Sequence, residues 1–185
     1  MIGRLFIFTG PSAVGKDSLL DKIRENGLNF HFVVTTTSRP PRGRETEGHP
    51  YHFVSREQFQ KLIEGDGLLE YAEVYGNYYG SAKKTVEAAL ENNRFVILRI
   101  DPQGAETVKR KMPEAKTIFI LPPSLDALEE RFRRRNEDSE KTIKKRLEAA
   151  KRELSHLERW DFTIVNEDNK LEKAAEKAMA FMEST

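Results

Sequence analysis

The chain of 185 residues contains no cysteine, and neither sign of charge dominates it. The absence of cysteine excludes disulfides, thiolate metal sites and thiol catalysis, and it is compatible with a reducing compartment. Because 31 Lys and Arg residues oppose 30 Asp and Glu residues, the formal net charge is only +1. No global field therefore favours nucleic acid or a membrane as a partner. Any anionic ligand must be bound by local clusters of cations.

Long hydrophobic runs are also absent from the sequence. No apolar stretch approaches the length of a membrane span. The N-terminal residues lack the basic segment, long apolar segment and small-residue cleavage site of a secretory signal. We therefore expect a cytoplasmic protein, a monomer or homodimer, whose partners are small molecules. The length suits one α/β domain with small insertions.

Apolar strand-like segments alternate with helical segments at both ends of the chain. The predicted strands are 5–9, 30–37, 68–74, 95–100, 117–121 and 162–165, and helices are predicted at 55–63, 82–92, 125–135, 140–159 and 171–182. This alternation predicts a parallel sheet of five strands with helices on both faces. The stretch 36–90 interrupts it, with tandem prolines, a capping-box helix and a predicted turn at 76–80. It is therefore predicted to be an insertion with its own small sheet.

The segment Gly10–Lys16 fits the pattern G-x-x-x-x-G-K of a phosphate-binding loop, with a predicted strand before it and a helix after it. Glycines at both ends let the backbone turn its N–H groups around a phosphate, and Lys16 can reach the terminal phosphates. A glycine-rich turn with a chance lysine is the alternative, and both flanking segments argue against it. The residues predicted to bind ATP here are Gly10, Pro11, Ser12, Ala13, Val14, Gly15, Lys16, Asp17 and Ser18.

Asp17 departs from this pattern, which has Ser or Thr after the lysine to help hold Mg²⁺. A carboxylate is also a hard-oxygen ligand, so Asp17 is a candidate Mg²⁺ ligand. It is larger than a hydroxyl, however, and it adds negative charge beside the polyphosphate.

The prolines between Arg39 and Arg42 stiffen a loop that carries guanidinium groups. A stiff loop presents such groups to a phosphate with little ordering cost. A solvated basic turn is the simpler explanation for the same residues, and this segment alone does not decide between them.

Several further motifs together resemble the guanylate kinase family over nearly the whole chain. They are the phosphate loop, Thr35–Arg42, Glu45–Tyr51, Glu70, the Gly-Asn-Tyr-Tyr-Gly-Ser segment at 76–81, Asp101–Gly104, Leu121–Ser124 and Ile164–Asn166. The resemblance implies a P-loop NTPase three-layer α/β fold that transfers the γ-phosphoryl group of ATP, with Mg²⁺, to GMP. It also implies a core at 1–35 and 91–185, a GMP-binding insertion at 36–90 and a helical lid at 132–147.

The resemblance further implies roles for residues outside the phosphate loop. Arg39, Arg42, Tyr51 and Tyr79 would hold the GMP phosphate, Glu70 with Thr35 and Ser81 would bind guanine, and Asp101 would complete the GMP site. Guanine offers N1–H and N2–H₂ on one edge, and one carboxylate can accept from both. Adenine lacks this donor pair and would leave Glu70 desolvated and unpaired.

The lid of the family carries arginines that bridge the two sets of phosphates. The matching positions are Arg131, Arg135 and Arg146, which with Lys16 form the predicted catalytic set. Asn166 matches a position near the adenine of ATP. Where the family has Arg-Gly-Thr-Glu, this chain has Arg-Asn-Glu-Asp at 135–138, and the missing glycine is expected to stiffen the hinge.

Arg99 is a second departure, because the family position is typically acidic. We hypothesise that Arg99 and Asp17 form an ion pair that offsets the unusual carboxylate. The alternatives are that Asp17 ligates Mg²⁺ directly, or that both residues are tolerated surface variation.

Two other functions remain open from the sequence. The segment Gly15–Leu20 also resembles the phosphate loop of ribose 1,5-bisphosphate phosphokinases, but such an enzyme has no need for a guanine-binding Glu70. A non-enzymatic phosphopeptide-binding module resembles the acceptor half of the family, but Lys16 and the lid arginines argue against it.

Overall fold

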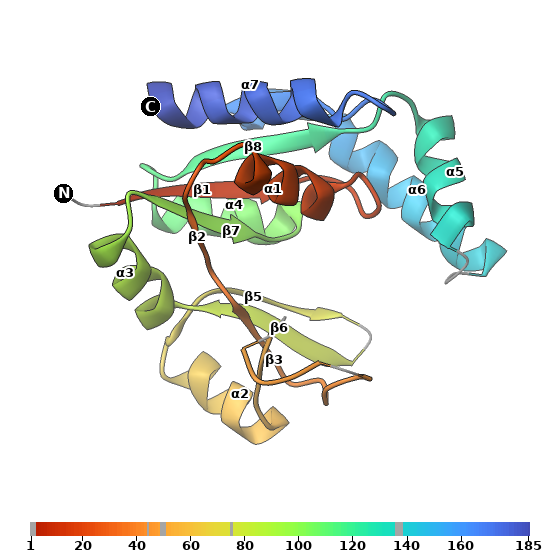
Figure 1. Cartoon of the computed structure of the whole chain (residues 1–185). Helices are drawn as coiled ribbons and strands as arrows, with labels where there is room; N and C mark the ends of the chain where they lie inside the picture. Colours follow the sequence, from red (N-terminus) through yellow and green to blue (C-terminus); the bar gives the residue numbers. More distant parts are fainter. Residues whose placement is uncertain (1–2, 44, 49–50, 75, 136–138) are drawn as a thin grey trace. The chain divides into compact units, whose positions relative to one another are not determined.

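A computed structural model describes residues 3–43, 45–48, 51–74, 76–135 and 139–185 of the chain (Figure 1). Its strands are β1 (Arg4–Thr9), β2 (His31–Phe32), β3 (Thr35–Thr37), β4 (Tyr51–Phe53), β5 (Leu68–Val74), β6 (Asn77–Ala82), β7 (Phe95–Arg99), β8 (Lys116–Leu121) and β9 (Phe162–Val165). Its helices are α1 (Lys16–Glu25), α2 (Arg56–Glu64), α3 (Lys83–Asn92), α4 (Pro102–Lys111), α5 (Leu125–Arg135), α6 (Glu140–Leu154) and α7 (Leu171–Ser184), with a short 3₁₀ helix at Leu157–Arg159.

The predicted parallel sheet of five strands is confirmed, with the order β2-β7-β1-β8-β9. Phe8 of β1 pairs in parallel with Ile118 of β8, and Ile120 of β8 pairs with Ile164 of β9. The strands β1, β7 and β8 are almost continuously apolar and buried. Such strands are typical of a parallel sheet that is covered on both faces.

A second sheet has the order β4-β3-β6-β5 and mixed direction. The strands β3 and β4 run parallel, whereas β6 runs antiparallel to both β3 and β5. Helix α2 starts with the predicted capping box: the Ser55 hydroxyl accepts from Gln58 N at 3.1 Å, and Ser55 N donates to Gln58 Oε1 at 2.7 Å. The two bonds satisfy donors that a helix start otherwise leaves open.

Three predicted elements were wrong in detail. The predicted strand 30–37 is two strands in different sheets, because Val33 N still bonds Ile97 O before the chain reaches β3. The predicted turn at 76–80 mostly belongs to strand β6, which pairs with β5 over its length. The predicted helix 140–159 ends at Leu154, where Ser155 N bonds back to Arg152 O. Helix α4 was not predicted.

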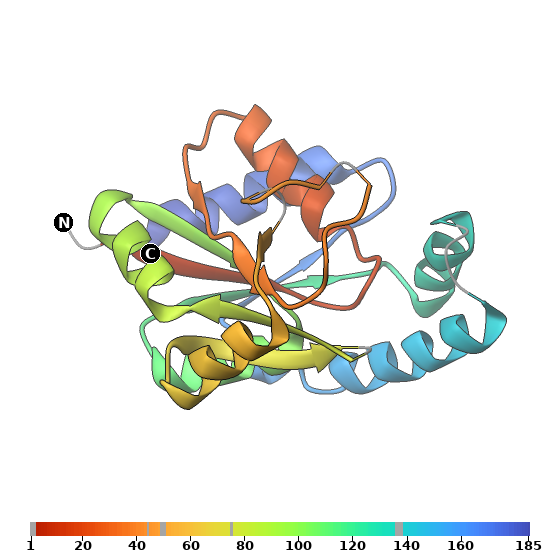
Figure 2. The same ribbon diagram turned by 90° about the horizontal axis from the view of Figure 1, so that it is seen from below.

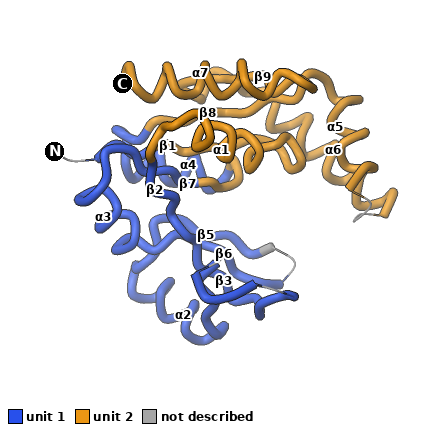
Figure 3. Tube along the Cα trace, in the orientation of Figure 1, with its two compact units in different colours: residues 1–5, 30–98, 103–115 blue, residues 6–29, 99–102, 116–185 orange. Residues whose placement is uncertain are grey.

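The chain divides into two compact units (Figure 3). Unit 1 comprises residues 1–5, 30–98 and 103–115, and unit 2 comprises residues 6–29, 99–102 and 116–185. Phe59, Leu68, Val86 and Val96 are among the buried residues of unit 1. The predicted division into core, insertion at 36–90 and lid at 132–147 stays a prediction.

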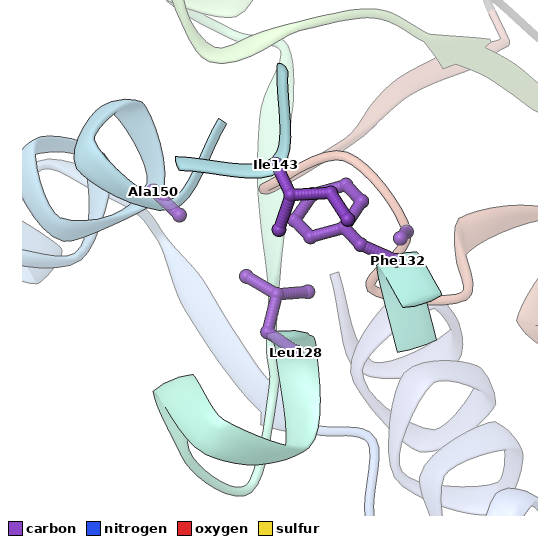
Figure 4. Packing of buried hydrophobic residues seen from close by; sticks show 5 residues of the cluster. Leu128, Phe132, Ile143 and Ala150 are labelled. Atoms are coloured by element: carbon purple, nitrogen blue, oxygen red, sulfur yellow. The ribbon is translucent and has the colours of Figure 1, made fainter. Parts of the chain in front are cut away.

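In unit 2, helices α1 and α7 pack side by side (Figures 1 and 2). The helices α5 and α6 also pack together, through an apolar cluster of Leu128, Phe132, Ile143 and Ala150 (Figure 4). Ala13 of the phosphate loop belongs to the same cluster. The cluster therefore connects the helices that carry the predicted lid arginines with the loop beside them. Among the described residues, no helix has both the length and the hydropathy of a membrane span.

Candidate active site

The predicted phosphate loop joins the end of β1 to the start of α1, as its motif requires. Gly15 has a φ of 94°, which favours glycine, and a Cβ there would lie 2.4 Å from the Asn166 Nδ2 atom. Ala13 also has a positive φ, of 63°, and is buried. A strained loop of this kind persists only where its surroundings hold it.

Lys16 is folded back onto the loop in this structure. Its Nζ atom donates to Gly10 O at 2.6 Å and to Pro11 O at 2.9 Å. Burial lowers the pKa of Lys16 from 10.5 to about 8, with Glu153 and Asp101 acting to raise it and Arg99 and Arg135 acting to lower it. The ammonium group is therefore weakly solvated and ready to exchange carbonyl partners for phosphate oxygens.

Two buried side chains support the loop, namely Asn166, which follows β9, and Arg131 of α5. Asn166 Nδ2 donates to Val14 O at 2.9 Å, and Arg131 donates to Val14 O at 3.1 Å and to Asn166 O at 2.7 Å. Arg131 also pairs with Asp168 at 2.8 Å. In this structure the Arg131 guanidinium thus binds protein oxygens. Its predicted contact with phosphates stays a prediction.

A pocket of about 260 Å³ lies beside the loop within unit 2. Its lining includes the predicted donor-site residues Ala13, Gly15, Ser18, Arg131, Arg135 and Asn166. The volume is slightly below the roughly 300–1,000 Å³ of most small-molecule sites. The walls are polar and contain three arginines together with Glu167 and Asp168.

The remaining predicted lid arginine, Arg146, reaches the loop from α6. Its Nη1 atom donates to Ser12 Oγ at 3.2 Å, and its guanidinium lies 5.6 Å from the centre of the Phe132 ring. Arg135 ends α5. Residues 136–138 of the predicted lid motif lie outside the described residues.

Asp17 and Arg99 form the ion pair hypothesised from the sequence, between Oδ1 and Nη1. Both residues belong to unit 2, as does Asp101. The described residues hold no group of three or more histidine or carboxylate side chains placed to bind a metal ion.

The predicted acceptor residues of unit 1 gather on one face of the four-stranded sheet. Directly opposed residues of paired strands share a face, as do alternate residues along one strand. Thr35 opposes Tyr51, Thr37 opposes Tyr79, and Glu70 opposes Ser81. Five predicted residues, namely Thr35, Tyr51, Glu70, Tyr79 and Ser81, therefore share this face.

The other face of the sheet packs on helix α2. The Tyr78 ring stacks on the Phe59 ring with centroids 5.2 Å apart. Tyr78 is therefore a packing aromatic, and its neighbour Tyr79 points toward the opposite face of the sheet.

Arg39 is 5% exposed, and most N–H donors of its guanidinium form hydrogen bonds within the protein. Nη1 and Nη2 donate to the two carboxylate oxygens of Glu45 at 2.8 and 3.0 Å, and Nη1 also donates to Pro40 O at 2.7 Å. Nε donates to the Tyr79 hydroxyl at 3.3 Å. That hydroxyl can still donate its own hydrogen, and Nη2 has a second hydrogen beyond the one directed to Glu45. Tyr79 and Arg39 can thus present two donors to one anion.

Glu70 is 4% exposed, and its Oε1 atom accepts from the Ser81 hydroxyl at 2.6 Å. A buried carboxylate keeps capacity for several hydrogen bonds, because each oxygen has two lone pairs. This makes Glu70 a suitable acceptor for a base that offers adjacent N–H donors. Arg42, by contrast, is exposed. Its backbone N–H donates to Glu45 Oε2 at 2.7 Å, and its carbonyl accepts from Glu45 N at 3.0 Å.

The sequence did not single out Glu45 or Glu153. The hydrogen bonds from Arg39 lower the pKa of Glu45, so this carboxylate stays ionised and orients Arg39. Burial raises the pKa of Glu153, and its Oε2 atom is buried with no hydrogen-bond partner among the residues that the structure describes. Helical spacing was an available signal for Glu153, which lies three residues after the buried Ala150 and hence on the inward side of α6.

A larger pocket in unit 1, of about 410 Å³, contains none of the predicted site residues. Its lysines are engaged within the protein: Lys83 pairs with Asp66 at 2.5 Å, and Lys111 Nζ donates to Leu68 O at 3.3 Å. We therefore assign no role to this pocket.

The sequence of the whole chain was compared with those of known proteins. The sequence profile described as guanylate kinase matches residues 2–185. The guanylate kinase of Synechococcus sp. (strain JA-3-3Ab) is 43% identical over 180 residues, covering 97% of this chain and 82% of the relative. That of Methylococcus capsulatus is 45% identical over 166 residues, covering 90% and 81%.

A solved structure supports the same assignment. The crystal structure of guanylate kinase from Anaplasma phagocytophilum superimposes with a TM-score of 0.76 at 32% identity, over 99% of this chain and 86% of that one. Sequence and fold agree over essentially the full length, and the chain belongs to the guanylate kinase family.

Proposed function

We propose that this chain is an ATP:GMP phosphotransferase, which converts ATP and GMP to ADP and GDP. The observation that carries the choice of acceptor is the buried Glu70 carboxylate, held by Ser81 on the same sheet face as Tyr79. A buried acid is costly unless a ligand or a protein group satisfies it. The N1–H and N2–H₂ donors of guanine match it, whereas the corresponding edge of adenine does not.

Arg39, Tyr79, Tyr51 and Arg42 are proposed to bind the phosphate of GMP. Arg39 and Tyr79 direct donors to one side, and Glu45 fixes the plane of the guanidinium. Thr35 is proposed to assist at guanine. Asp101 is proposed to complete the GMP site from the segment that follows β7.

The donor, MgATP, is proposed to bind at the phosphate loop, with the Gly10–Ser18 segment around its phosphates and Asn166 near its adenine. Mg²⁺ enters with ATP as part of the substrate. The described residues contain no cluster that would hold the ion alone, which fits an ion bound mainly by phosphate oxygens and water.

The transfer itself needs little covalent chemistry from the protein. Phosphoryl transfer depends on positioning and on neutralising charge on the transferred oxygens. Lys16, leaving Gly10 O and Pro11 O, is proposed to bind the terminal phosphates. Arg135 and Arg146 are proposed to neutralise the transferred group, while Arg131 holds Val14 and Asn166 in place. Arginines in such positions contribute factors of about 10³ to 10⁵.

The two other functions are disfavoured by specific observations. A ribose 1,5-bisphosphate phosphokinase has no chemical use for a buried Glu70. A phosphopeptide-binding module has no use for the half-buried Lys16 or for the hydrogen bond from Arg146 to Ser12. The cytoplasmic location and the monomeric or homodimeric state stay predictions.

A coupled ADP-release assay tests the proposal. The purified chain is assayed with GMP, AMP, ribose 1,5-bisphosphate and no acceptor. Turnover with GMP that exceeds the others by at least about a hundredfold is expected. Lys16→Ala should abolish turnover with every acceptor, because it removes the cation at the donor phosphates. Turnover mainly with ribose 1,5-bisphosphate, or with no acceptor, would contradict the proposal.

A further inference from the structure

Two unusual residues of this chain meet beside the phosphate loop. Asp17 is the second residue of α1, where the loop motif has a hydroxyl, and Arg99 is the last residue of β7. Ile100 N donates to Phe8 O at 3.3 Å. This bond holds the segment that follows Arg99 beside the end of β1, which leads into the loop.

The side chains are in direct ion-pair contact, Arg99 Nη1 with Asp17 Oδ1. The Arg99 side chain is 23% exposed and that of Asp17 is 67% exposed. The basic partner is thus mostly covered by protein, whereas the acidic partner is largely in solvent. The contact places the negative charge of Asp17 next to a fixed positive one.

Arg99 also influences Lys16, the cation of the loop. Its positive charge is one of the causes that lower the pKa of Lys16. The Arg99 charge disfavours a cation at the position of Lys16. It would therefore favour an anion, such as a phosphate, at the same position. Lys16, Asp17 and Arg99 together carry a formal charge of +1. A loop with the usual Ser or Thr after the lysine carries the same charge, because the hydroxyl is neutral.

We propose that Asp17 and Arg99 act as one neutral unit at the donor-phosphate site. Arg99 cancels the repulsion that the Asp17 carboxylate would exert on the phosphates of ATP, and Asp17 is not a ligand of Mg²⁺. This inference rests on the proposed binding of ATP at the loop. Both residues are positioning residues that set the charge around Lys16.

The test measures ATP affinity of the full chain by titration calorimetry, with excess Mg²⁺ and separately with EDTA. The variants are Asp17→Asn, Arg99→Gln and the double variant. Arg99→Gln leaves Asp17 uncompensated and should weaken binding on the order of tenfold in both conditions. Asp17→Asn should tighten binding. The double variant should return to within about threefold of the parent, because its two neutral side chains have the same net charge as the ion pair.

Asp21→Asn is the matched control, since Asp21 is an exposed carboxylate one turn further along α1, 3.8 Å from Arg24. It should change ATP affinity less than about threefold, because exposed charges are screened. The opposite effects of the two single variants should also shrink as salt is added. Melting temperatures verify that each variant folds.

Three results would overturn the inference. Loss of affinity in Asp17→Asn that occurs only with Mg²⁺ would make Asp17 a metal ligand. If neither single variant changes ATP affinity, whether or not its melting temperature changes, the pair has only a structural role. Weak binding by the double variant would mean that Arg99 acts alone. A parent chain that binds no ATP would instead refute the proposed function.

Discussion

Glu70 provides the most direct test at the scale of one residue. Glu70→Gln keeps the shape but replaces one acceptor oxygen with an NH₂ group, which faces the N–H donors of guanine. The kcat/KM for GMP should fall by at least about a hundredfold. The new NH₂ group and an N–H group of guanine would both be donors, so neither would have an acceptor. ATP affinity should not change, since the phosphate loop belongs to unit 2. Steady-state kinetics with GMP varied measures this.

Glu73→Gln is the control for that experiment. Glu73 lies on the same strand but is exposed, and it pairs with Arg56 at 3.3 Å. Its replacement should leave GMP kinetics within about twofold, as exposed ion pairs contribute little. Equal effects of the two variants, or none, would remove Glu70 from guanine binding.

Lys16 predicts a pH dependence of ATP binding. Its pKa is lowered to about 8 in the empty protein, mainly by burial, and phosphates bind the protonated form. Affinity for ATP should therefore fall about tenfold per pH unit above pH 8. Titrations between pH 7 and 9.5 measure this. Lys16→Ala should bind more weakly throughout and lose the dependence, and a parallel dependence in both proteins would contradict the prediction.

The same group predicts a stability change of definite sign. The unfolded chain keeps the Lys16 proton up to about pH 10.5, whereas the folded chain loses it near pH 8. The unfolded state thus binds more protons between these values, so the contribution of Lys16 to stability rises with pH across that window. Below pH 8 the buried charge is unfavourable. Lys16→Met should accordingly raise the melting temperature at pH 7, by calorimetry, while abolishing phosphoryl transfer.

Candidate site residues could be predicted from the sequence where a motif or a departure from a motif marks them. The Lys16 motif, the Glu70 acid and the Asp17–Arg99 contact were all inferred from the chain. Glu45 was not, although its partners Arg39 and Arg42 are close in sequence, because no periodic pattern marks a bond within an irregular loop. Glu153 was not, because Lys16 and Asp101 beside it are distant in sequence. The bonds from Arg131 to Val14 O and Asn166 O could not be predicted either. Every residue has a backbone carbonyl, so the sequence does not mark which ones will accept.

At the scale of elements, the hairpin of β5 and β6 depends on Gly80. A Cβ there would lie 2.7 Å from Glu70 O, 2.9 Å from Tyr71 Cβ and 3.1 Å from Phe59 Cζ. Gly80→Ala should push β6 away from β5 and displace Glu70 and Ser81. The KM for GMP should rise at least about tenfold, since small misplacements of a site are costly.

Gly65→Ala is a matched control in the same unit. A Cβ at Gly65 would meet only Lys61 O, at 3.1 Å. This variant should show a modest loss of melting temperature and an unchanged KM for GMP. A normal KM in Gly80→Ala would show that the hairpin tolerates the extra methyl group.

Elements were predictable where the local pattern was consistent. The predicted helix 125–135 has the observed bounds of α5, and the predicted strand 162–165 has those of β9. The segment 30–37 was not, because β-branched residues favour a strand without specifying which sheet it joins. The tyrosine-rich segment 76–80 suggested a turn from Gly76 and Asn77, yet pairing with β5 extends it as strand β6.

For the whole molecule, we expect a change on binding both nucleotides. Transfer to GMP instead of water requires that water be excluded around the reacting phosphates. The predicted insertion at 36–90 and lid at 132–147 should therefore close when ATP and GMP sites are both filled. The radius of gyration from X-ray scattering should fall with a bisubstrate analogue. Superimposable curves with and without the analogue would contradict closure.

The fold class was predictable because strand–helix alternation extends over long stretches of sequence. The family was predictable because its motifs are distributed from the phosphate loop to Asn166. The second sheet was expected as a small sheet within the insertion at 36–90, without a strand order. Its strand order depends on pairings such as Thr36 with Gly80, which join residues far apart in the chain.

The bonds from Asn166 and Arg131 to Val14 have a consequence for biosynthesis. The loop lies near the start of the chain, but Asn166 Nδ2 and Val14 O are 152 residues apart in sequence. A ribosome therefore synthesises the loop well before Arg131 and Asn166 exist to bond Val14 O. The nascent chain should remain unable to capture ATP until β9 and Asn166 have emerged, because the loop lacks these supports before then.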